Sequence, residues 1–328
     1  MNVHAETKFD YTACAVEYNH DLDVFAVGTY ELVDTQTDKD GRISHQQRKG
    51  DCSIYDCTGR SFRKLSSRDT PGTLDMKWSK DLLGIVDAEG MLSIDRYAGG
   101  SLAPLLSVDC KAASSSSPSL ALSLDWNNVR READPVVAVS MSDGRALTVD
   151  ARTQQTLQDW QAHDFETWIA AWDHYSNDTL YTGADDCIFK AWDLRSGVDT
   201  PVLSNKRFDG GVTTITNSPH NHHELAVGSY DESLRLFDKR NLKTPTATIA
   251  TSGGIWRIKY HITNPTALVT ASMYGGFDVV DLESKAVTFT NSDHNLGYGV
   301  DWNTDGLIMS ASFYDKKGML WNAAPAPC

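Results

Sequence analysis

An apolar or aromatic residue followed by Asp or Asn recurs along the whole sequence and constrains its fold more than any other feature. The seven copies are Tyr55-Asp56, Ile94-Asp95, Val149-Asp150, Trp192-Asp193, Phe237-Asp238, Val280-Asp281 and Trp321-Asn322. Their successive spacings are 39, 55, 43, 45, 43 and 41 residues. A chain with such a period folds as an array of similar units, each of which packs against its neighbours.

Each unit reads as short β-strands separated by turns. An alternating stretch such as GTLDMKW or TWIAAWD comes first, a β-rich stretch such as ELAVGSY follows, and a third strand after a tight turn carries the dyad. Four-stranded units of roughly 40–45 residues are typical of WD repeats, which form the blades of β-propellers. The sequence therefore predicts an all-β, seven-bladed WD-repeat β-propeller, a single domain that spans residues 1–328.

The two ends of the chain indicate how the ring closes. After Trp321 only NAAPAPC remains, which is too short and too Pro-rich for a fourth strand, whereas HAETKFDY (4–11) precedes the first strand of blade one. We expect this N-terminal strand to close the last blade and cover its open edge; the alternative is a frayed tail. Two stretches, 34–51 and 111–119, are expected to be flexible insertions, the first a charged loop and the second a Ser-rich connector.

Composition narrows the classes of partner. The chain has 30 Lys and Arg against 44 Asp and Glu, a net charge of −14, which argues against direct binding of nucleic acid. No apolar run has membrane-spanning length, no signal pattern is present, and the six cysteines form no metal or disulfide framework. We expect a soluble, cytoplasmic monomer that requires no cofactor and no metal ion.

Polar residues at fixed places in the repeats predict buried networks. In WD repeats a His, a Ser or Thr, an Asp and the dyad Trp form a hydrogen-bonded tetrad, which satisfies polar groups that would otherwise be buried without partners. Two blades offer complete sets: His163, Thr182, Asp186 and Trp192 in blade four, and His294, Ser310, Asp315 and Trp321 in blade seven. A structural role is the preferred interpretation, although both histidines remain candidates for proton transfer.

Blade six departs from the pattern at the turn after its second strand. It reads TASMYGGFDVVD, so Tyr274 stands where the tetrad Asp belongs, and it opens with GGIWRIKYH, which places Trp256 and Arg257 at the start of the innermost strand. These turns and strand starts converge on one face, around the channel mouth. Other blades add aromatic residues there: Trp168, Tyr230, Tyr298 and Tyr314. We expect an aromatic pocket with one arginine; the alternative is that the two tryptophans only pack between blades.

Common catalytic motifs are missing from the sequence. It contains no Gly-x-Ser-x-Gly elbow, phosphate-binding loop or dinucleotide fingerprint. HNHH (220–223) is interpreted as a solvated loop on the opposite face rather than a metal site. Cys187 follows two aspartates whose charges raise the pKa of a thiol, so we do not expect it to act as a nucleophile.

Three longer stretches, 160–195, 253–281 and 296–315, resemble the diphthamide-pathway WD-repeat family, the diphthine methyl ester hydrolases or WD repeat protein 85 family. The resemblance is specific in blades four, six and seven and is only the general WD pattern in blades one to three. It implies hydrolysis of the methyl ester of methylated diphthine on elongation factor 2, which yields methanol and diphthine. The resemblance does not identify a catalytic motif in this chain.

The chemistry of that substrate suits the predicted pocket. Methylated diphthine carries a trimethylammonium group beside the ester, and aromatic faces are the natural receptor for a cation that cannot donate a hydrogen bond. The substrate-binding candidates are Trp168, Trp256, Tyr274, Tyr298 and Tyr314. Arg257 is expected to stabilise the carbonyl oxygen under attack. Four further catalytic candidates could activate water: His163, His294, Glu166 and Asp185.

Two other functions remain open at this point. A non-catalytic adaptor could present elongation factor 2 to the amidating enzyme, as the missing nucleophile motif and the usual role of propellers suggest. A histone- or methyl-lysine-binding WD module would use an aromatic cage as well. Release of methanol by the purified protein separates the hydrolase from both.

Overall fold

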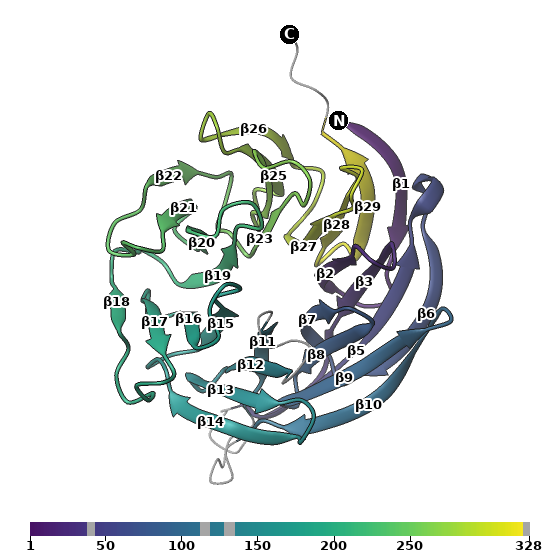
Figure 1. Cartoon of the computed structure of the whole chain (residues 1–328). Coiled ribbons are helices and arrows are strands. Elements are labelled where there is room, and N and C mark those ends of the chain that lie inside the picture. The colour runs from purple at the N-terminus through teal and green to yellow at the C-terminus, as the bar shows by residue number, and fades with distance from the viewer. Residues whose placement is uncertain (38–42, 112–118, 128–134, 324–328) are drawn as a thin grey trace.

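Seven antiparallel sheets are arranged in a ring in the computed structural model (Figure 1), which describes residues 1–37, 43–111, 119–127 and 135–323. We call the axis of this ring the central channel. This arrangement confirms the predicted seven-bladed β-propeller. The innermost strands are β2, β7, β11, β15, β19, β23 and β27 (Figure 1), and each blade continues outward from its own innermost strand. In the described part of the chain no helix is long and apolar enough to cross a membrane.

Blades one to three contain the following strands. Blade one has β2 (Ala13–Asn19), β3 (Val24–Thr29), β4 (Glu31–Thr37), β5 (Ile43–Asp56) and β6 (Arg63–Thr70), with the 3-10 turn η1 (Thr58–Arg60) between the last two. Blade two has β7 (Thr73–Ser79), β8 (Leu82–Asp87), β9 (Met91–Ala98) and β10 (Ser101–Asp109). Blade three has β11 (Ala121–Trp126), β12 (Val136–Met141), β13 (Arg145–Asp150) and β14 (Gln155–Gln161).

Blades four to seven follow the same plan. Blade four has β15 (Thr167–Trp172), β16 (Thr179–Ala184), β17 (Phe189–Asp193) and β18 (Leu203–Asn205). Blade five has β19 (Val212–Asn217), β20 (Glu224–Ser229), β21 (Ser233–Asp238) and β22 (Ala247–Ala250). Blade six has β23 (Arg257–Tyr260), β24 (Ala267–Ala271), β25 (Phe277–Asp281) and β26 (Ala286–Asn291). Blade seven has β27 (Gly297–Trp302), β28 (Ile308–Ser312) and β29 (Lys317–Asn322), and β1 (Asn2–Lys8) completes it.

The N-terminal strand closes the ring, as the sequence predicts. Strand β1 pairs antiparallel with β29, with Val3 opposite Trp321 and Lys8 opposite Lys317. The side chains of His4 and Asn322 add a hydrogen bond of 2.6 Å between Nε2 and Oδ1. The alternative of a frayed tail is therefore wrong, and the edge of β29 is covered by the other end of the chain.

The segment 34–51 differs from the predicted loop. Its described residues belong to β4 and β5, which pair as a hairpin with Glu31 opposite Lys49. No apolar alternation marks this strand in the sequence, because the described β4 side chains beyond Glu31 are exposed. Residues 38–42, and 112–118 of the second predicted insertion, lie outside the described residues; the flexibility of both insertions stays a prediction.

Candidate functional site

A cavity of about 280 Å³ opens at the mouth of the central channel. We call it the mouth cavity. Its walls are aromatic on the side of blades four to seven and aliphatic on the side of blades two and three, where Leu74, Leu120 and Leu122 lie. The expected pocket is present, and the arginine that lines it is Arg48 rather than Arg257.

Four aromatic rings form a continuous wall of the mouth cavity. Trp256, at the entry to β23, stacks on Tyr298 of β27 with ring centroids 4.9 Å apart and an angle of 19° between the planes. Trp168 of β15 meets Trp256 edge to face at 5.5 Å. Tyr230, in the turn after β20, lies 6.3 Å from both tryptophans. All four side chains are half-buried, so they pack against one another and also present ring surface to the cavity.

Backbone and side-chain hydrogen bonds fix the two tryptophans. The indole Nε1 of Trp168 donates to Oδ1 of Asp185 at 3.2 Å. The backbone N–H of Trp256 donates to the carbonyl of Ala271 at 2.7 Å, whereas its indole nitrogen is buried without a partner among the described residues. Asp185 is itself exposed and does not line the mouth cavity, so the structure places it as the residue that orients Trp168.

Glu166 and Arg48 bring opposite charges to the mouth cavity from different sides of the ring. Glu166 precedes β15 in blade four, where its carbonyl accepts a 3.0 Å hydrogen bond from the N–H of Asp185. Arg48 lies on β5 in blade one and donates to Oε1 of Gln46 at 3.0 Å. Both side chains are half-buried, and neither forms an ion pair with any residue that the structure describes.

The remaining groups of the cavity are protonated at neutral pH. Burial raises the pKa of Tyr298 to about 12 and also raises that of Tyr230 and Tyr30. Burial likewise raises the pKa of the Cys14 thiol, whose Sγ donates to the carbonyl of Thr73 at 2.9 Å. Glu166 is the carboxylate among the residues that line this cavity.

Arg257 packs against Trp256 but is not among the residues that line the mouth cavity. Only 5% of it is exposed, and its guanidinium carbon is 5.1 Å from the Trp256 ring centroid. Its Nη1 donates to the carbonyl of Trp256 at 3.0 Å, and its Nη2 lies 3.4 Å from Oδ1 of Asp75. The charge of Arg257 is thus already paired, and the side chain supports Trp256 from within the channel.

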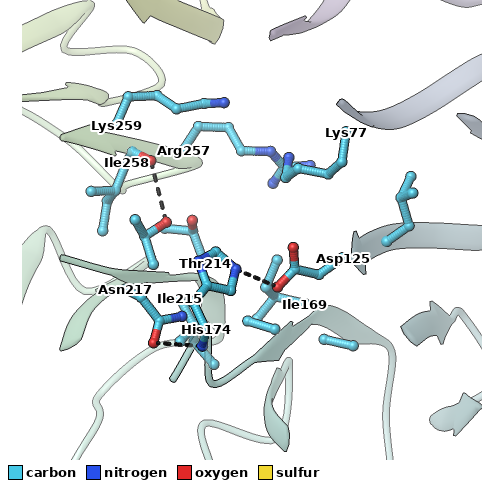
Figure 2. Close-up of a pocket in the computed structure, with 14 residues that line it drawn as sticks. Lys77, Asp125, Ile169, His174, Thr214, Ile215, Asn217, Arg257, Ile258 and Lys259 are labelled. Carbon is cyan, nitrogen blue, oxygen red and sulfur yellow. Dashed lines mark hydrogen bonds and ion pairs between the residues drawn. The ribbon is translucent and has the colours of Figure 1, made fainter. Parts of the chain in front are cut away.

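Deeper in the channel, Arg257, Lys77 and Lys259 converge on a second cavity of about 170 Å³, as Figure 2 shows. Each lysine is paired: Lys77 Nζ lies 2.6 Å from Glu17, and Lys259 Nζ lies 2.5 Å from the same carboxylate and 3.0 Å from Asp301. This channel cavity therefore carries a network of ion pairs between the innermost strands of several blades. On the opposite wall, His174 Nε2 bonds Oδ2 of Asp125 at 3.2 Å (Figure 2).

The blade-four tetrad forms in full. His163 Nδ1 is 2.9 Å from Oδ2 of Asp186, its Nε2 is 2.8 Å from Oγ1 of Thr182, and the Trp192 indole donates to the same hydroxyl at 2.9 Å. His163 does not line the mouth cavity. Burial lowers its pKa, against the raising effect of Asp186.

The blade-seven tetrad is incomplete. His294 Nε2 and the Trp321 indole both bond the Ser310 hydroxyl, at 3.1 and 2.9 Å. Nδ1 of His294 and Oδ1 of Asp315 are buried without partners in the described part of the chain. Burial lowers the pKa of His294 to about 4, and this histidine too is separate from the mouth cavity.

Blade six replaces the tetrad with a different network. The carboxylate of the fully buried Asp278 accepts hydrogen bonds from the hydroxyls of Ser252, Ser272 and Thr290. Gly276 has φ +93°, and a Cβ there would lie 2.1 Å from the carbonyl oxygen of Asn291, so the turn requires glycine. Because Asp278 supplies the buried carboxylate of this blade, the turn position of Tyr274 needs no buried polar group, and Tyr274 is exposed.

Tyr274 and Tyr314 lie outside the mouth cavity. They are 72% and 58% exposed, and Tyr314 contacts Phe313 with ring centroids 5.2 Å apart.

Of the ten expected site residues, the structure brings Trp168, Trp256, Tyr298 and Glu166 together in one cavity. Sequence reasoning missed Arg48 because the surrounding segment was interpreted as a loop. It named Tyr230 at this face but not as a binding residue.

The comparisons with known proteins agree with the propeller. A family model described as WD domain, G-beta repeat matches residues 201–238. A chain of a crystal structure of the mitotic checkpoint complex superposes with a TM-score of 0.75 at 14% identity, covering 99% of this chain and 95% of that one. At that identity the likeness concerns the fold alone.

Several relatives match over most of the chain. A Dictyostelium discoideum protein named diphthine methyltransferase homolog is 32% identical, over 96% of this chain and 98% of its own. Mouse diphthine methyltransferase is 34% identical over 95% of this chain and 71% of its own. The Schizosaccharomyces pombe protein of that name is 28% identical, with 95% of each chain covered.

Proposed function

This chain belongs to the diphthine methyltransferase family, and from that premise we propose that it acts in diphthamide biosynthesis as a carboxylic ester hydrolase. Its substrate in this proposal is the methyl ester of methylated diphthine on elongation factor 2, and its products are diphthine and methanol. We also propose the cytoplasm as its location, because the described cysteines are free thiols.

The observation that carries the proposal is the mouth cavity itself. Trp168, Tyr230, Trp256 and Tyr298 offer ring faces, and Glu166 adds a negative charge beside them. A desolvated contact between a quaternary ammonium and an aromatic face contributes about 2 kcal/mol. The trimethylammonium group of methylated diphthine would therefore bind here, which places the neighbouring ester in the cavity.

Glu166 and Arg48 supply the two groups that ester hydrolysis needs. Glu166 removes a proton from a water molecule, whose oxygen attacks the ester carbonyl carbon. Arg48 donates hydrogen bonds to the carbonyl oxygen as it becomes negative, an effect worth about 3–4 kcal/mol for a single donor. When the intermediate collapses, the C–O bond to the methoxy group breaks, Glu166 returns the proton, and methanol leaves. Asp185 and Arg257 act as positioning residues through the two tryptophans.

Exposed aromatic residues on the same face favour the adaptor as a second candidate. Phe165, Tyr274 and Tyr314 are 59%, 72% and 58% exposed, as expected where a protein partner docks. Such residues serve a hydrolase equally well, because its substrate is also a protein. The aromatic wall leaves the methyl-lysine-binding module open too.

Purified protein mixed with elongation factor 2 that bears methylated diphthine tests the proposal. We expect release of methanol and a mass loss of about 14 Da from the factor with no other enzyme present. Binding of the factor without methanol release would support the adaptor. Binding of methylated peptides but not of the factor would support the methyl-lysine module. A mass gain of about 14 Da that requires S-adenosylmethionine would show methyl transfer instead.

A further inference from the structure

We propose that the mouth cavity is a receptor for carboxylate betaines, in which Arg48 binds the carboxylate and the aromatic wall binds the trimethylammonium group. The hydrolysis product carries both groups, so it and free betaines would occupy the site and inhibit the reaction. The statement about the product rests on the proposed function, whereas the binding of betaines requires no turnover.

The position of Arg48 is built into the fold. Strand β5 passes so close to β3 at Gly50 that a Cβ there would lie 1.9 Å from the carbonyl oxygen of Thr29. On the other side, a Cβ at Gly72 would lie 3.2 Å from the Cβ of Arg48 and 3.1 Å from that of Tyr30. These close approaches fix the backbone that carries Arg48 against blade two, beside the cavity.

The charge of Arg48 is available to a ligand. Among the residues that the structure describes, its one polar partner is the neutral amide of Gln46, and no carboxylate pairs with it. Arg257, by contrast, is paired with Asp75. A half-buried guanidinium without a counter-ion, beside a cavity, favours an anionic ligand, and its planar donors match the two oxygens of a carboxylate.

A carboxylate satisfies Arg48 better than an ester does. The ester offers a neutral carbonyl oxygen, whereas the acid offers two charged oxygens and charge-assisted hydrogen bonds that are roughly twice as strong. Hydrolysis therefore converts a ligand that fits the guanidinium weakly into one that fits it strongly. The same side chain that assists the attack would hold the product.

The rest of the cavity sets the orientation of such a ligand. Glu166 and Trp168 come from the start of blade four with Tyr230 of blade five beside them, whereas Arg48 and Tyr30 come from blade one. Repulsion from Glu166 directs a carboxylate toward Arg48, and attraction keeps the ammonium group near the aromatic wall. A small zwitterion thus matches both charges of the cavity at once.

Three small probes separate the two halves of this receptor. Tetramethylammonium carries the cation alone, glycine betaine methyl ester adds a neutral carbonyl, and glycine betaine adds the carboxylate. By titration calorimetry at neutral pH and low ionic strength, we expect glycine betaine to bind roughly tenfold more tightly than tetramethylammonium. We expect Arg48→Gln to abolish this difference and Trp256→Ala to weaken all three probes.

Lys49→Gln is the matched control, because it removes one positive charge from the exposed neighbour on β5. It should retain the wild-type preference for glycine betaine. Equal affinities of the wild-type protein for glycine betaine and tetramethylammonium would overturn the proposal. So would an unchanged preference in Arg48→Gln.

Inhibition of methanol release gives an independent readout. Glycine betaine should compete with the modified factor in the wild-type reaction, and choline, which has no carboxylate, should compete at least severalfold less well. If methanol is released but glycine betaine neither binds nor inhibits, the betaine receptor alone fails. If calorimetry shows the expected preference and no methanol forms, the receptor stands and the hydrolase proposal fails.

Discussion

Two arginines, Arg48 at the mouth cavity and Arg257 deeper in the channel, show that the partners of a side chain decide its role more than its position along the sequence does. Arg257 adjoins Trp256, which made it the expected oxyanion donor, but its buried charge is paired with Asp75. Arg48 comes from a segment without any catalytic signature, yet it lines the mouth cavity and retains its charge for a ligand. An already paired guanidinium has less capacity to stabilise new negative charge.

At this scale, Glu166→Gln tests the assigned general base. The amide cannot take a proton from water, so we expect kcat for methanol release to fall roughly 10²–10⁴-fold. Glu166 is half-buried and forms no ion pair within the described residues, so Tm should change little. Asp164→Asn removes an exposed carboxylate from the same loop and should retain the wild-type rate. Equal rates for wild type and Glu166→Gln would remove Glu166 from the mechanism.

Arg257→Ala tests the supporting role of the second arginine. The substitution leaves the buried Asp75 with Lys77 as its remaining ion-pair partner among the described residues, so we expect a loss of roughly 3 kcal/mol in the free energy of unfolding. Because Trp256 loses its support, KM should rise more than kcat falls. Denaturant unfolding and steady-state kinetics measure the two effects. A fully stable variant with no turnover would instead show that Arg257 is a catalytic residue.

At the scale of strands and turns, the blades share one arrangement. Where a blade departs from it, the cause is the local hydrogen bonding of its side chains. Blade four has its full tetrad because His163 bonds both Asp186 and Thr182. Blade seven lacks the His–Asp bond, and blade six uses Asp278 with three hydroxyls. The sequence predicted the complete tetrad of blade four, but in blade seven the predicted bond to Asp315 is wrong. A hydrogen bond depends on side-chain orientation to within a few tenths of an ångström, which the sequence does not reveal.

Acid should destabilise blade seven through His294. Its pKa is about 4 in the folded protein and about 6.5 when unfolded. The unfolded chain therefore takes up a proton as the pH falls below about 6.5 while the folded protein does not, so stability declines until about pH 4. Thermal unfolding across this window should show a shallower decline for His294→Gln than for wild type. Parallel curves would contradict the lowered pKa.

The whole molecule is closed by contacts between segments that lie far apart in the sequence. Strand β1 completes the blade formed by residues near the C-terminus, and the channel network joins Glu17 to Lys77 and Lys259. These contacts link the first, second and sixth blades across the channel. A propeller relies on such closure because an open ring would expose the edge of its last sheet.

Deletion of residues 2–8 tests closure directly. The edge of β29 loses its partner strand, so we expect Tm to fall by roughly 10 °C or more and oligomers to form through the exposed edge. Scanning calorimetry and size-exclusion chromatography measure these effects. A monomer with the Tm of the full chain would show that β1 contributes little to the ring.

The sequence by itself determined the number of blades, the strand that closes them and the face on which the aromatic residues gather. Each of these follows from periodicity, because a repeated pattern places equivalent residues at equivalent points of every blade. Only the tertiary structure decided which arginine lines the mouth cavity, which carboxylate accompanies it and which histidines are confined to the scaffold. Arg48, Glu166 and Trp256 lie on different blades. Local sequence patterns do not predict that residues so far apart in the sequence lie close together in the folded chain.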